Sequence, residues 1–211
     1  MDNVTKNFRE HYRSTIIKHG PNFKGVDWNN KKDADLRYHL ILEVLSDYPK
    51  NKTHSFLDIG CGYGSLLKEA KKKKISLKYT GLDIVPEMID IAKKNNPHVK
   101  FINKDVFSLS EKKQYDFVVA NGLLTQKLKA SNYDMEKFMF RLINKMWSLS
   151  KKGIAFNILT SQVDFKNREN FYYDPVILIN KIKKMTRFFK IRHDYPIFEY
   201  TFYLYKKPNL K

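Results

Sequence analysis

The chain has 211 residues, 42% of them hydrophobic and 14% aromatic, which fits one globular domain with a packed core and argues against disorder. Its apolar runs fall short of the roughly 20 residues of a membrane span, its N-terminus is polar, and its single cysteine excludes an internal disulfide and a cysteine-based zinc cluster. We therefore expect a cytoplasmic protein with no membrane span, secretory signal or metal site.

The formal net charge of +18 leaves two interpretations open. One is an anionic partner, such as nucleic acid, a membrane surface or a phosphorylated substrate. The other is a compositional bias combined with solvated helix faces. The 33 lysines and 7 arginines favour the second interpretation, because arginine is the better residue for bidentate recognition of phosphate.

The predicted elements alternate along most of the chain. Residues 1–50 are aromatic, basic and helical, with a break at Gly20 and Pro21. Beyond them, strands are predicted at 54–60, 77–84, 99–106, 115–122, 153–160, 189–195 and 198–206, and helices at 65–74, 86–95, 135–150 and 174–186. This rhythm is typical of a parallel sheet with helices on both faces, and the short turn at Pro196 lets the last two strands pair antiparallel. No linker or repeat divides the chain.

A glycine-rich turn follows the first predicted strand, with glycines at 60, 62 and 64. Such a turn, placed before the first helix of a doubly wound sheet, points its amides at a ligand. Its G-x-G-x-G spacing differs from the dinucleotide fingerprint, and Asp58 just before it would repel a pyrophosphate but attract a cationic amino acid. Asp83 ends the second strand, where a carboxylate accepts hydrogen bonds from both ribose hydroxyls.

Four segments together resemble the motifs of class I S-adenosylmethionine-dependent methyltransferases: FLDIGCGYGSLL at 56–67, YTGLDIVPEMIDIA at 79–92, NKDVF at 103–107 and YDFVVANGLL at 115–124. The resemblance extends over residues 54–206. It implies an α/β fold with a Rossmann-like seven-stranded sheet in the order 3-2-1-4-5-7-6, strand 7 antiparallel, helices on both faces and an N-terminal helical lid. We expect a single domain over residues 1–211, with residues 1–50 as lid and substrate segment and residues 51–211 as cofactor-binding core.

The same resemblance implies S-adenosylmethionine as methyl donor and S-adenosylhomocysteine as product. Asp58 is expected near the amino-acid part, Asp83 at the ribose and Asp105 at the adenine amino group. The other expected cofactor contacts come from Gly60, Cys61, Gly62 and Gly64 in the turn, Ile84 and Met88 beside the adenine, the backbone of Val106, and the backbone of Asn121 or Gly122 near the methionine portion. In this position Cys61 is interpreted as a small loop residue and not as a nucleophile.

The methyl acceptor is expected between the N-terminal segment and the loops that follow the fourth and fifth strands. Its predicted contacts are Tyr12, Lys24, Trp28, Lys127, Arg168 and Tyr173. Five cations on these segments would neutralise an anionic acceptor, namely Lys24, Lys127, Lys129, Lys166 and Arg168. The aromatic N-terminal side chains Tyr12, His19, Phe23 and Trp28 either close over the cofactor or pack on the sheet. The candidate bases are His19 and His193, beside Asp27 and Asp164, and none belongs to a defined triad.

Three absences bear on the kind of acceptor. The segment ANGLL at 120–124 lacks the (D/N/S)-PP-(Y/F) signature of amino-methylating DNA and protein-glutamine enzymes, a single cysteine excludes the paired cysteines of RNA 5-methylcytosine enzymes, and no RNA-binding module is recognised. They favour O-methylation of a small polar metabolite that carries phosphate or carboxylate, as in sugar or capsule pathways. The alternatives are an RNA (tRNA or rRNA) methyltransferase, N-methylation of a small amine, and a binding scaffold without activity, against which the intact glycines and Asp83 argue.

Overall fold

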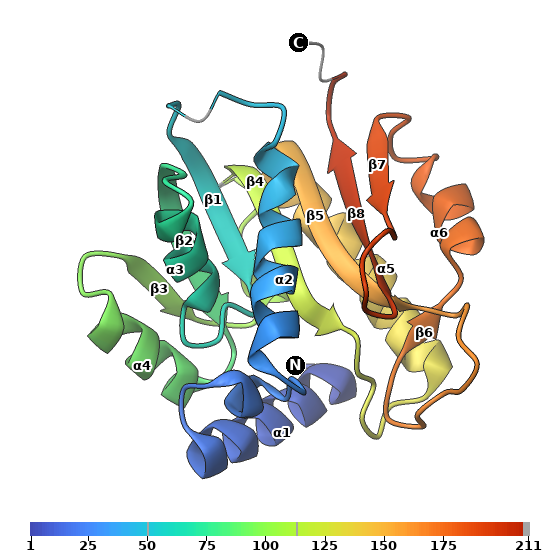
Figure 1. Cartoon of the computed structure of the whole chain (residues 1–211), viewed down its shortest axis with the longest axis horizontal. Coiled ribbons are helices and arrows are strands. Elements are labelled where there is room, and N and C mark those ends of the chain that lie inside the picture. Colours follow the sequence, from blue (N-terminus) through green and yellow to red (C-terminus); the bar gives the residue numbers. More distant parts are fainter. Residues whose placement is uncertain (50, 113, 209–211) are drawn as a thin grey trace.

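The computed structural model describes residues 1–49, 51–112 and 114–208, which fold around one continuous sheet (Figure 1). The strand order is β3-β2-β1-β4-β5-β8-β7, and the short β6 also pairs with β5. Strands β1 to β6 pair parallel, whereas β8 runs antiparallel to both β5 and β7. The strands are β1 (His54–Ile59), β2 (Leu77–Asp83), β3 (Lys100–Asn103), β4 (Tyr115–Leu124), β5 (Ser150–Thr160), β6 (Tyr172–Tyr173), β7 (Phe189–Arg192) and β8 (Glu199–Tyr205).

This order confirms the predicted sheet. The two-residue β6, which the sequence pattern did not reveal, shifts the numbering of the last two strands by one and leaves their places unchanged. The turn around Pro196 joins β7 and β8 as the predicted antiparallel hairpin, with Ile191 opposite Phe202. A parallel crossover would need a dozen or more residues at this point, so the short connection already decided the direction of β8.

Helices cover both faces of the sheet. The helices are α1 (Asn3–His19), α2 (Lys31–Leu42), α3 (Ser65–Lys72), α4 (Pro86–Asn95), α5 (Asn132–Leu149) and α6 (Pro175–Ile182), with short 3₁₀ turns η1 (Phe23–Val26), η2 (Glu43–Leu45) and η3 (Val106–Ser108). Helices α2, α3 and α4 share one buried cluster with Phe56 and Phe117, and α5 and α6 share the other with Leu57 and Val118. Successive residues of β1 and β4 thus supply opposite faces, as the alternation of side chains along a strand requires.

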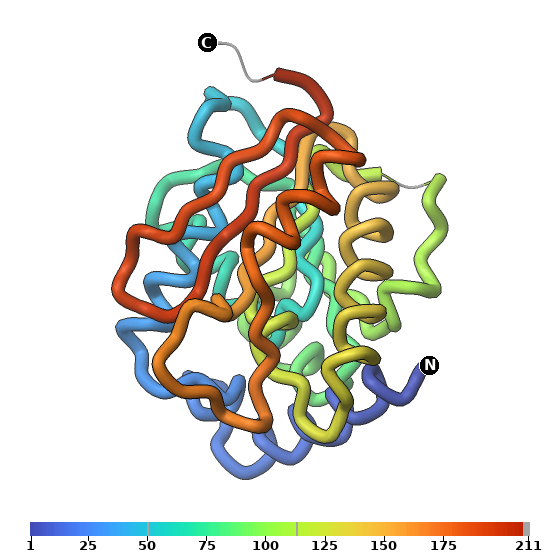
Figure 2. The backbone as a smooth tube through the Cα atoms, turned by 90° about the vertical axis from the view of Figure 1, so that its right-hand side faces the viewer, coloured from blue at the N-terminus to red at the C-terminus, as the bar shows by residue number. Residues whose placement is uncertain are grey.

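Helix α1 lies across the carboxyl ends of the parallel strands, and Figures 1 and 2 both place it beneath that end of the sheet. The helix begins where Asp2 accepts a hydrogen bond from the amide of Thr5, and it ends at Gly20, whose φ is +70°. Two ion pairs attach α1 and its N-cap to the core, Arg13 to Glu87 of α4 at 2.6 Å and Arg141 of α5 to Asp2 at 2.8 Å.

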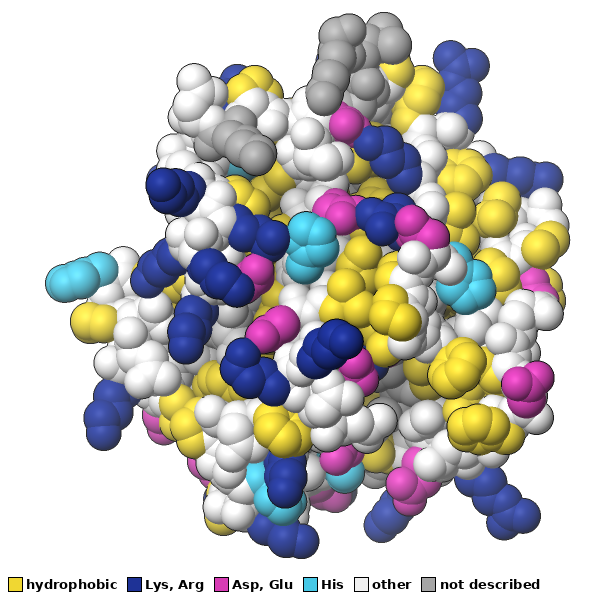
Figure 3. Space-filling model, in the orientation of Figure 1, with side chains coloured by type: hydrophobic (Ala, Val, Ile, Leu, Met, Phe, Trp, Pro, Cys, Tyr) yellow, Lys and Arg dark blue, Asp and Glu magenta, His cyan; other side chains and the backbone are white. Residues whose placement is uncertain are grey.

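Charged side chains of both signs share the surface. On the face drawn in Figure 3, lysine and arginine side chains stand among acidic and apolar ones, with the densest group at the side of α3 and α4. Within the part of the chain that the structure describes, no helix is both long enough and apolar enough to cross a membrane.

Candidate active site

The glycine turn forms the floor of the site. Gly60, Gly62 and Gly64 have φ values of +71°, +52° and +88°, which side-chain-bearing residues rarely adopt. A Cβ atom on Gly60 would lie 2.9 Å from Leu123, and one on Gly62 would lie 3.4 Å from Val26 of the N-terminal segment. The first two glycines therefore permit close approach of neighbouring elements at the end of β1.

Gly64 has a different place from the one predicted. It is the N-cap of α3, and a Cβ atom there would lie 3.3 Å from Phe101. It is absent from the lining of the cavity described below, although the resemblance placed it among the cofactor contacts. Its glycine serves the left-handed turn into α3, a role that spacing alone does not distinguish from ligand contact.

Two buried carboxylates stand beside the turn. Asp83 accepts hydrogen bonds from the amides of Gly62 at 2.8 Å and Val85 at 2.9 Å, so it holds the turn and the start of α4 together. Asp58 accepts a hydrogen bond of 2.5 Å from the Tyr79 hydroxyl. Burial raises the pKa of Asp83, and burial raises the pKa of Asp58 to about 7.

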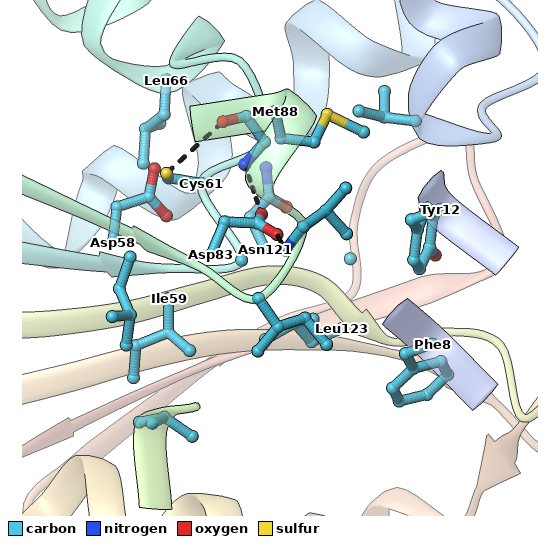
Figure 4. Close-up of a pocket in the computed structure, with 18 of the residues that line it drawn as sticks. Phe8, Tyr12, Asp58, Ile59, Cys61, Leu66, Asp83, Met88, Asn121 and Leu123 are labelled. Atoms are coloured by element: carbon cyan, nitrogen blue, oxygen red, sulfur yellow. Dashed lines mark hydrogen bonds between the residues drawn. The ribbon is translucent and has the colours of Figure 1, made fainter. Parts of the chain in front are cut away.

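A cavity with about 1020 Å³ of empty space, part of it open to solvent, lies at the carboxyl ends of β1, β2 and β4. Figure 4 shows Asp58, Cys61, Asp83 and Asn121 on the sheet side of it, with Phe8 and Tyr12 of α1 facing them. The structure brings eleven of the twelve predicted cofactor residues into the lining: Asp58, Gly60, Cys61, Gly62, Asp83, Ile84, Met88, Asp105, Val106, Asn121 and Gly122.

The thiol of Cys61 is buried, and burial raises its pKa well above the ordinary value. A thiol in this state stays protonated near neutral pH and is a poor nucleophile. Its environment agrees with the interpretation of Cys61 as a small residue of the turn.

The N-terminal segment covers this cavity. Tyr12, Val26 and Trp28 line it, whereas His19 and Phe23 do not, although all the aromatic side chains were candidates for a lid. Asp27 joins the segment to the loop after β4, because its carboxylate bonds to His11 Nε2 at 2.8 Å and accepts from Gln126 Nε2 at 2.9 Å. The hydrogen bond with His11 is the main reason that the pKa of Asp27 is lowered.

Most predicted acceptor contacts lie elsewhere. Only Tyr12 and Trp28 of that set line the cavity. Lys24 and Arg168 are exposed, Lys127 Nζ donates to the backbone at Ala130, and the Tyr173 hydroxyl donates to Glu136 at 2.6 Å. The loops after β4 and β5 bond to each other, for example through the amides of Lys127 and Leu128 to the carbonyl of Glu169, and this pairing holds their cations away from the cavity.

The candidate bases also lie outside the lining. His193 is exposed and packs edge-on against Tyr200, with 6.0 Å between ring centroids, and His19 ends α1. Asp164 is exposed in the loop after β5, and Asp27 is engaged by His11 and Gln126. Among the residues that the structure describes around the cavity there is no histidine.

Several lining residues escaped the motifs. Thr5 and Phe8 were not predicted, but they precede the predicted Tyr12 at i, i+3 and i+7 along α1, so helical periodicity could have assigned all three to one face. The Asn121 side chain is a second omission, because only its backbone was expected to act. Both polar atoms of its amide are buried without a hydrogen-bond partner, as is Thr5 Oγ1. Buried polar groups of this kind are normally satisfied, so the amide points to a ligand.

The donor set fits S-adenosylmethionine. Among its described residues, the cavity is lined by three aspartates, Asp58, Asp83 and Asp105, and by one lysine, Lys104. This excess of acidic groups suits a ligand with a cationic ammonium and sulfonium. Ile84, Met88 and Val106 supply an apolar wall of the kind that an adenine ring requires.

Comparison with known proteins agrees with this geometry. A family model described as a methyltransferase domain matches residues 56–145. The Mycobacterium tuberculosis protein Rv1506c, named as a methyltransferase, is 30% identical over 154 residues, which cover 70% of this chain and 90% of the relative. Malonyl-[acyl-carrier protein] O-methyltransferase 1 of Ilyobacter polytropus is 29% identical over 144 residues, which cover 65% of this chain but only 50% of that relative.

The fold has solved counterparts. The crystal structure of magnesium protoporphyrin IX methyltransferase from Synechocystis PCC 6803 with bound S-adenosylmethionine superposes with a TM-score of 0.68 at 14% identity, over 98% of this chain and 99% of that one. The sheet order, the motif-bearing turn and the sequence relatives lead to one conclusion: the chain belongs to the class I S-adenosylmethionine-dependent methyltransferases.

Proposed function

We propose that this enzyme methylates an oxygen of a small, carboxylate-bearing metabolite. The observation that carries the proposal is that the described residues lining the cavity include no histidine, and that their carboxylates, on Asp58, Asp83 and Asp105, each already accept a hydrogen bond. An alcohol acceptor needs a group that removes its proton, whereas a carboxylate is already ionised at neutral pH and needs only to be positioned. The Ilyobacter relative is named as an O-methyltransferase for malonyl-[acyl-carrier protein], and a malonyl group carries a free carboxylate.

In the proposed arrangement, Asp83 holds the ribose, Asp105 the adenine and Asp58 the amino-acid part of S-adenosylmethionine. The cofactor supplies an electrophilic methyl group on a positively charged sulfur. The residues of this chain bind it, orient it and exclude water, with Phe8 and Tyr12 closing the cavity from the lid side. These carboxylates are engaged, Asp58 with Tyr79, Asp83 with two amides and Asp105 with the amide of Phe107, which leaves the acceptor to other groups.

Neutral donors would hold the acceptor carboxylate. The unpartnered Asn121 amide, the Tyr12 hydroxyl and the Trp28 indole N–H all belong to residues of the lining. Hydrogen bonds to a charged acceptor are stronger than those between neutral groups, so two or three neutral donors suffice to position it. Recognition through the five predicted cations is not part of this proposal, because none of them lines the cavity.

The test uses S-adenosylmethionine carrying a labelled methyl group and a panel of small carboxylic acids, alcohols and amines. A carboxylate acceptor yields a methyl ester, which mild base cleaves to volatile labelled methanol, whereas methyl ethers and methylamines keep the label. Base-labile product with a carboxylic acid would support the proposal. Base-stable product formed only with alcohols or amines would overturn it, and label in added RNA would favour the alternative acceptor.

Asp58 should make cofactor binding depend on pH. Burial raises its folded-state pKa to about 7, above the ordinary value of an aspartate, so the carboxyl group in the ligand-free site is largely neutral below pH 7 and must ionise to meet the ligand's ammonium group. We expect affinity for S-adenosylhomocysteine to rise about fivefold from pH 6 to pH 7 and to level off above it. Calorimetry at several pH values measures this, with 5′-methylthioadenosine, which lacks the ammonium group, as control.

The Asp58→Asn variant completes that experiment. It cannot ionise, so its affinity for S-adenosylhomocysteine should be low and flat across the same pH range. An unchanged pH dependence in this variant would assign the titration to another group. Stability should change in the opposite direction: because the folded pKa of Asp58 is raised, ligand-free protein should lose stability as pH rises from about 4 to 7, and the variant should lose less.

Asp27 should control how long the ligand stays bound. Replacing Asp27 with alanine removes its bond to His11 within the lid. It also removes its bond to Gln126, which joins the lid to the loop after β4. We expect Asp27→Ala to raise the dissociation rate of S-adenosylhomocysteine roughly three- to tenfold, since lost hydrogen bonds of about 1 kcal/mol fall mainly on dissociation. Stopped-flow displacement measures the rate. The matched control is Asp33→Ala, which removes a half-buried carboxylate that accepts from Asn30 Nδ2 at 2.8 Å at the start of α2. Equal dissociation rates in the two variants would show that the bonds of Asp27 do not hold the lid closed over the ligand.

A further inference from the structure

A closed ring of five residues connects the lid to the wall of the cavity. Its members come from five segments: Trp28 before α2, Arg37 in α2, Gly122 in β4, Asn157 in β5 and Glu199 in β8. Trp28 and Gly122 line the cavity, whereas the other three lie behind its wall. We infer that Arg37, Glu199 and Asn157 are positioning residues, which fix the Gly122 end of the cavity and seat Trp28 over it.

The ring begins with a buried ion pair. The Glu199 side chain is 1% exposed and that of Arg37 is 14% exposed. Arg37 Nε donates to Glu199 Oε1 at 2.8 Å, and a second guanidinium nitrogen donates to the same oxygen. A buried charge is costly unless it is paired and hydrogen-bonded, so this carboxylate needs a reason beyond packing.

The second carboxylate oxygen sets the orientation of Asn157. Asn157 Nδ2 donates to Glu199 Oε2 at 2.5 Å, while Asn157 Oδ1 accepts from the amide of Gly122 at 2.7 Å. An ionised carboxylate only accepts hydrogen bonds, so the NH₂ group of Asn157 must face Glu199 and its oxygen must face Gly122. The charge on Glu199 thereby determines which atom meets the backbone of β4.

Trp28 closes the ring. A Cβ atom on Gly122 would lie 3.4 Å from the Trp28 indole, at the edge of van der Waals contact, so the indole packs directly on this glycine. The guanidinium carbon of Arg37 lies 5.2 Å from the centroid of the same indole, within the range of a cation–π contact. One arginine therefore contacts the lid residue and also anchors the chain of bonds that ends at the residue beneath it.

The ring acts at one end of the cavity. Strand β1 lies between β2, which ends at Asp83, and β4, where Asn121 and Gly122 follow the paired segment. Gly122 thus stands beside the glycine turn and on the side away from Asp83. If the ribose lies at Asp83, the ring positions the amino-acid portion of the ligand and leaves the adenosine portion alone. A general loss of stability would weaken both portions equally.

The test compares two ligands in calorimetry, S-adenosylhomocysteine and 5′-methylthioadenosine, which lacks the amino-acid portion. The variant Asn157→Ala removes the link to Gly122 and leaves the Arg37–Glu199 pair intact. We expect it to weaken S-adenosylhomocysteine roughly five- to tenfold and 5′-methylthioadenosine by less than twofold. Hydrogen exchange in the segment 118–126 should accelerate, because the amide of Gly122 loses its acceptor.

The variant Glu199→Gln gives the second measurement. Its single acceptor oxygen cannot serve both Arg37 and Asn157, so it should show the same ligand difference as Asn157→Ala. The matched control is Glu43→Gln, which removes a carboxylate bonded to Arg192 at 2.5 Å outside the cavity and should leave both affinities unchanged. If Glu199→Gln does not fold, Asn157→Ala decides alone. Parallel losses for both ligands, or no loss for either, would overturn the inference.

Discussion

Replacing Asp83 with alanine should weaken S-adenosylhomocysteine binding by roughly 100-fold. The carboxylate is 9% exposed, and besides the ribose it would hold, it already accepts from the amides of Gly62 and Val85. Charge-assisted hydrogen bonds to a ligand are worth about 1.5–3 kcal/mol, and loss of the two amide contacts releases the glycine turn as well. Calorimetry with the purified variant measures the loss.

Asp90→Ala is the matched control, because it deletes the same group from the exposed side of α4. Its affinity should stay within twofold of the parent protein. Asp83→Asn separates the two roles of the carboxylate, since an amide oxygen still accepts from one backbone N–H but carries no charge. An Asp83→Ala protein that binds as tightly as its parent would place the ribose elsewhere.

Replacing Gly60 with alanine should cost about 2–4 kcal/mol of the free energy of unfolding and disrupt the site. An alanine at a φ of +71° is strained, and its methyl group would lie 2.9 Å from Leu123, which lines the same cavity. Either Leu123 or the turn must move, so we also expect S-adenosylhomocysteine affinity to fall at least tenfold. Urea unfolding measures the first effect and calorimetry the second.

Gly20→Ala separates backbone strain from contact. Gly20 has nearly the same φ, +70°, yet a Cβ atom there meets nothing within 4 Å. Because Gly20 also has a ψ of −173°, in a region essentially restricted to glycine, this variant should lose roughly 1–3 kcal/mol of stability, yet it should bind the ligand normally. An equal loss of ligand affinity in the two variants would show that contact with Leu123 is unimportant, and normal binding by Gly60→Ala would show that the turn tolerates displacement.

Much of the fold could be predicted from the sequence. The alternation of apolar runs and helical patterns predicted a parallel sheet with helices on both faces, and the short turn at Pro196 predicted its antiparallel last hairpin. The strand order that the structure shows was implied by the resemblance to the methyltransferase motifs. The glycine turn and Asp83 predicted a ligand site, and Gly60, Gly62 and Asp83 all line the cavity. These features could be predicted because a turn type and a strand end are set by neighbouring residues. Family and cofactor followed from those motifs.

What joins distant segments could be decided only by the tertiary structure. The lysines and arginine of the loops after β4 and β5 were expected at the cavity, but the loops bond to each other and hold these cations outside it. Gly64 shares the motif with Gly60, yet its neighbour in space, Phe101, gives it a different role.

The three positioning residues of the ring, Arg37, Asn157 and Glu199, have no sequence signal. They are up to 162 residues apart, and their bonds depend on which strands lie side by side. By itself, the sequence determined the fold, the family and the cofactor end of the site, since these rest on local spacing. The tertiary structure decided the lid, the outward course of the loops and the support behind Gly122, since these rest on contacts between elements far apart in the chain.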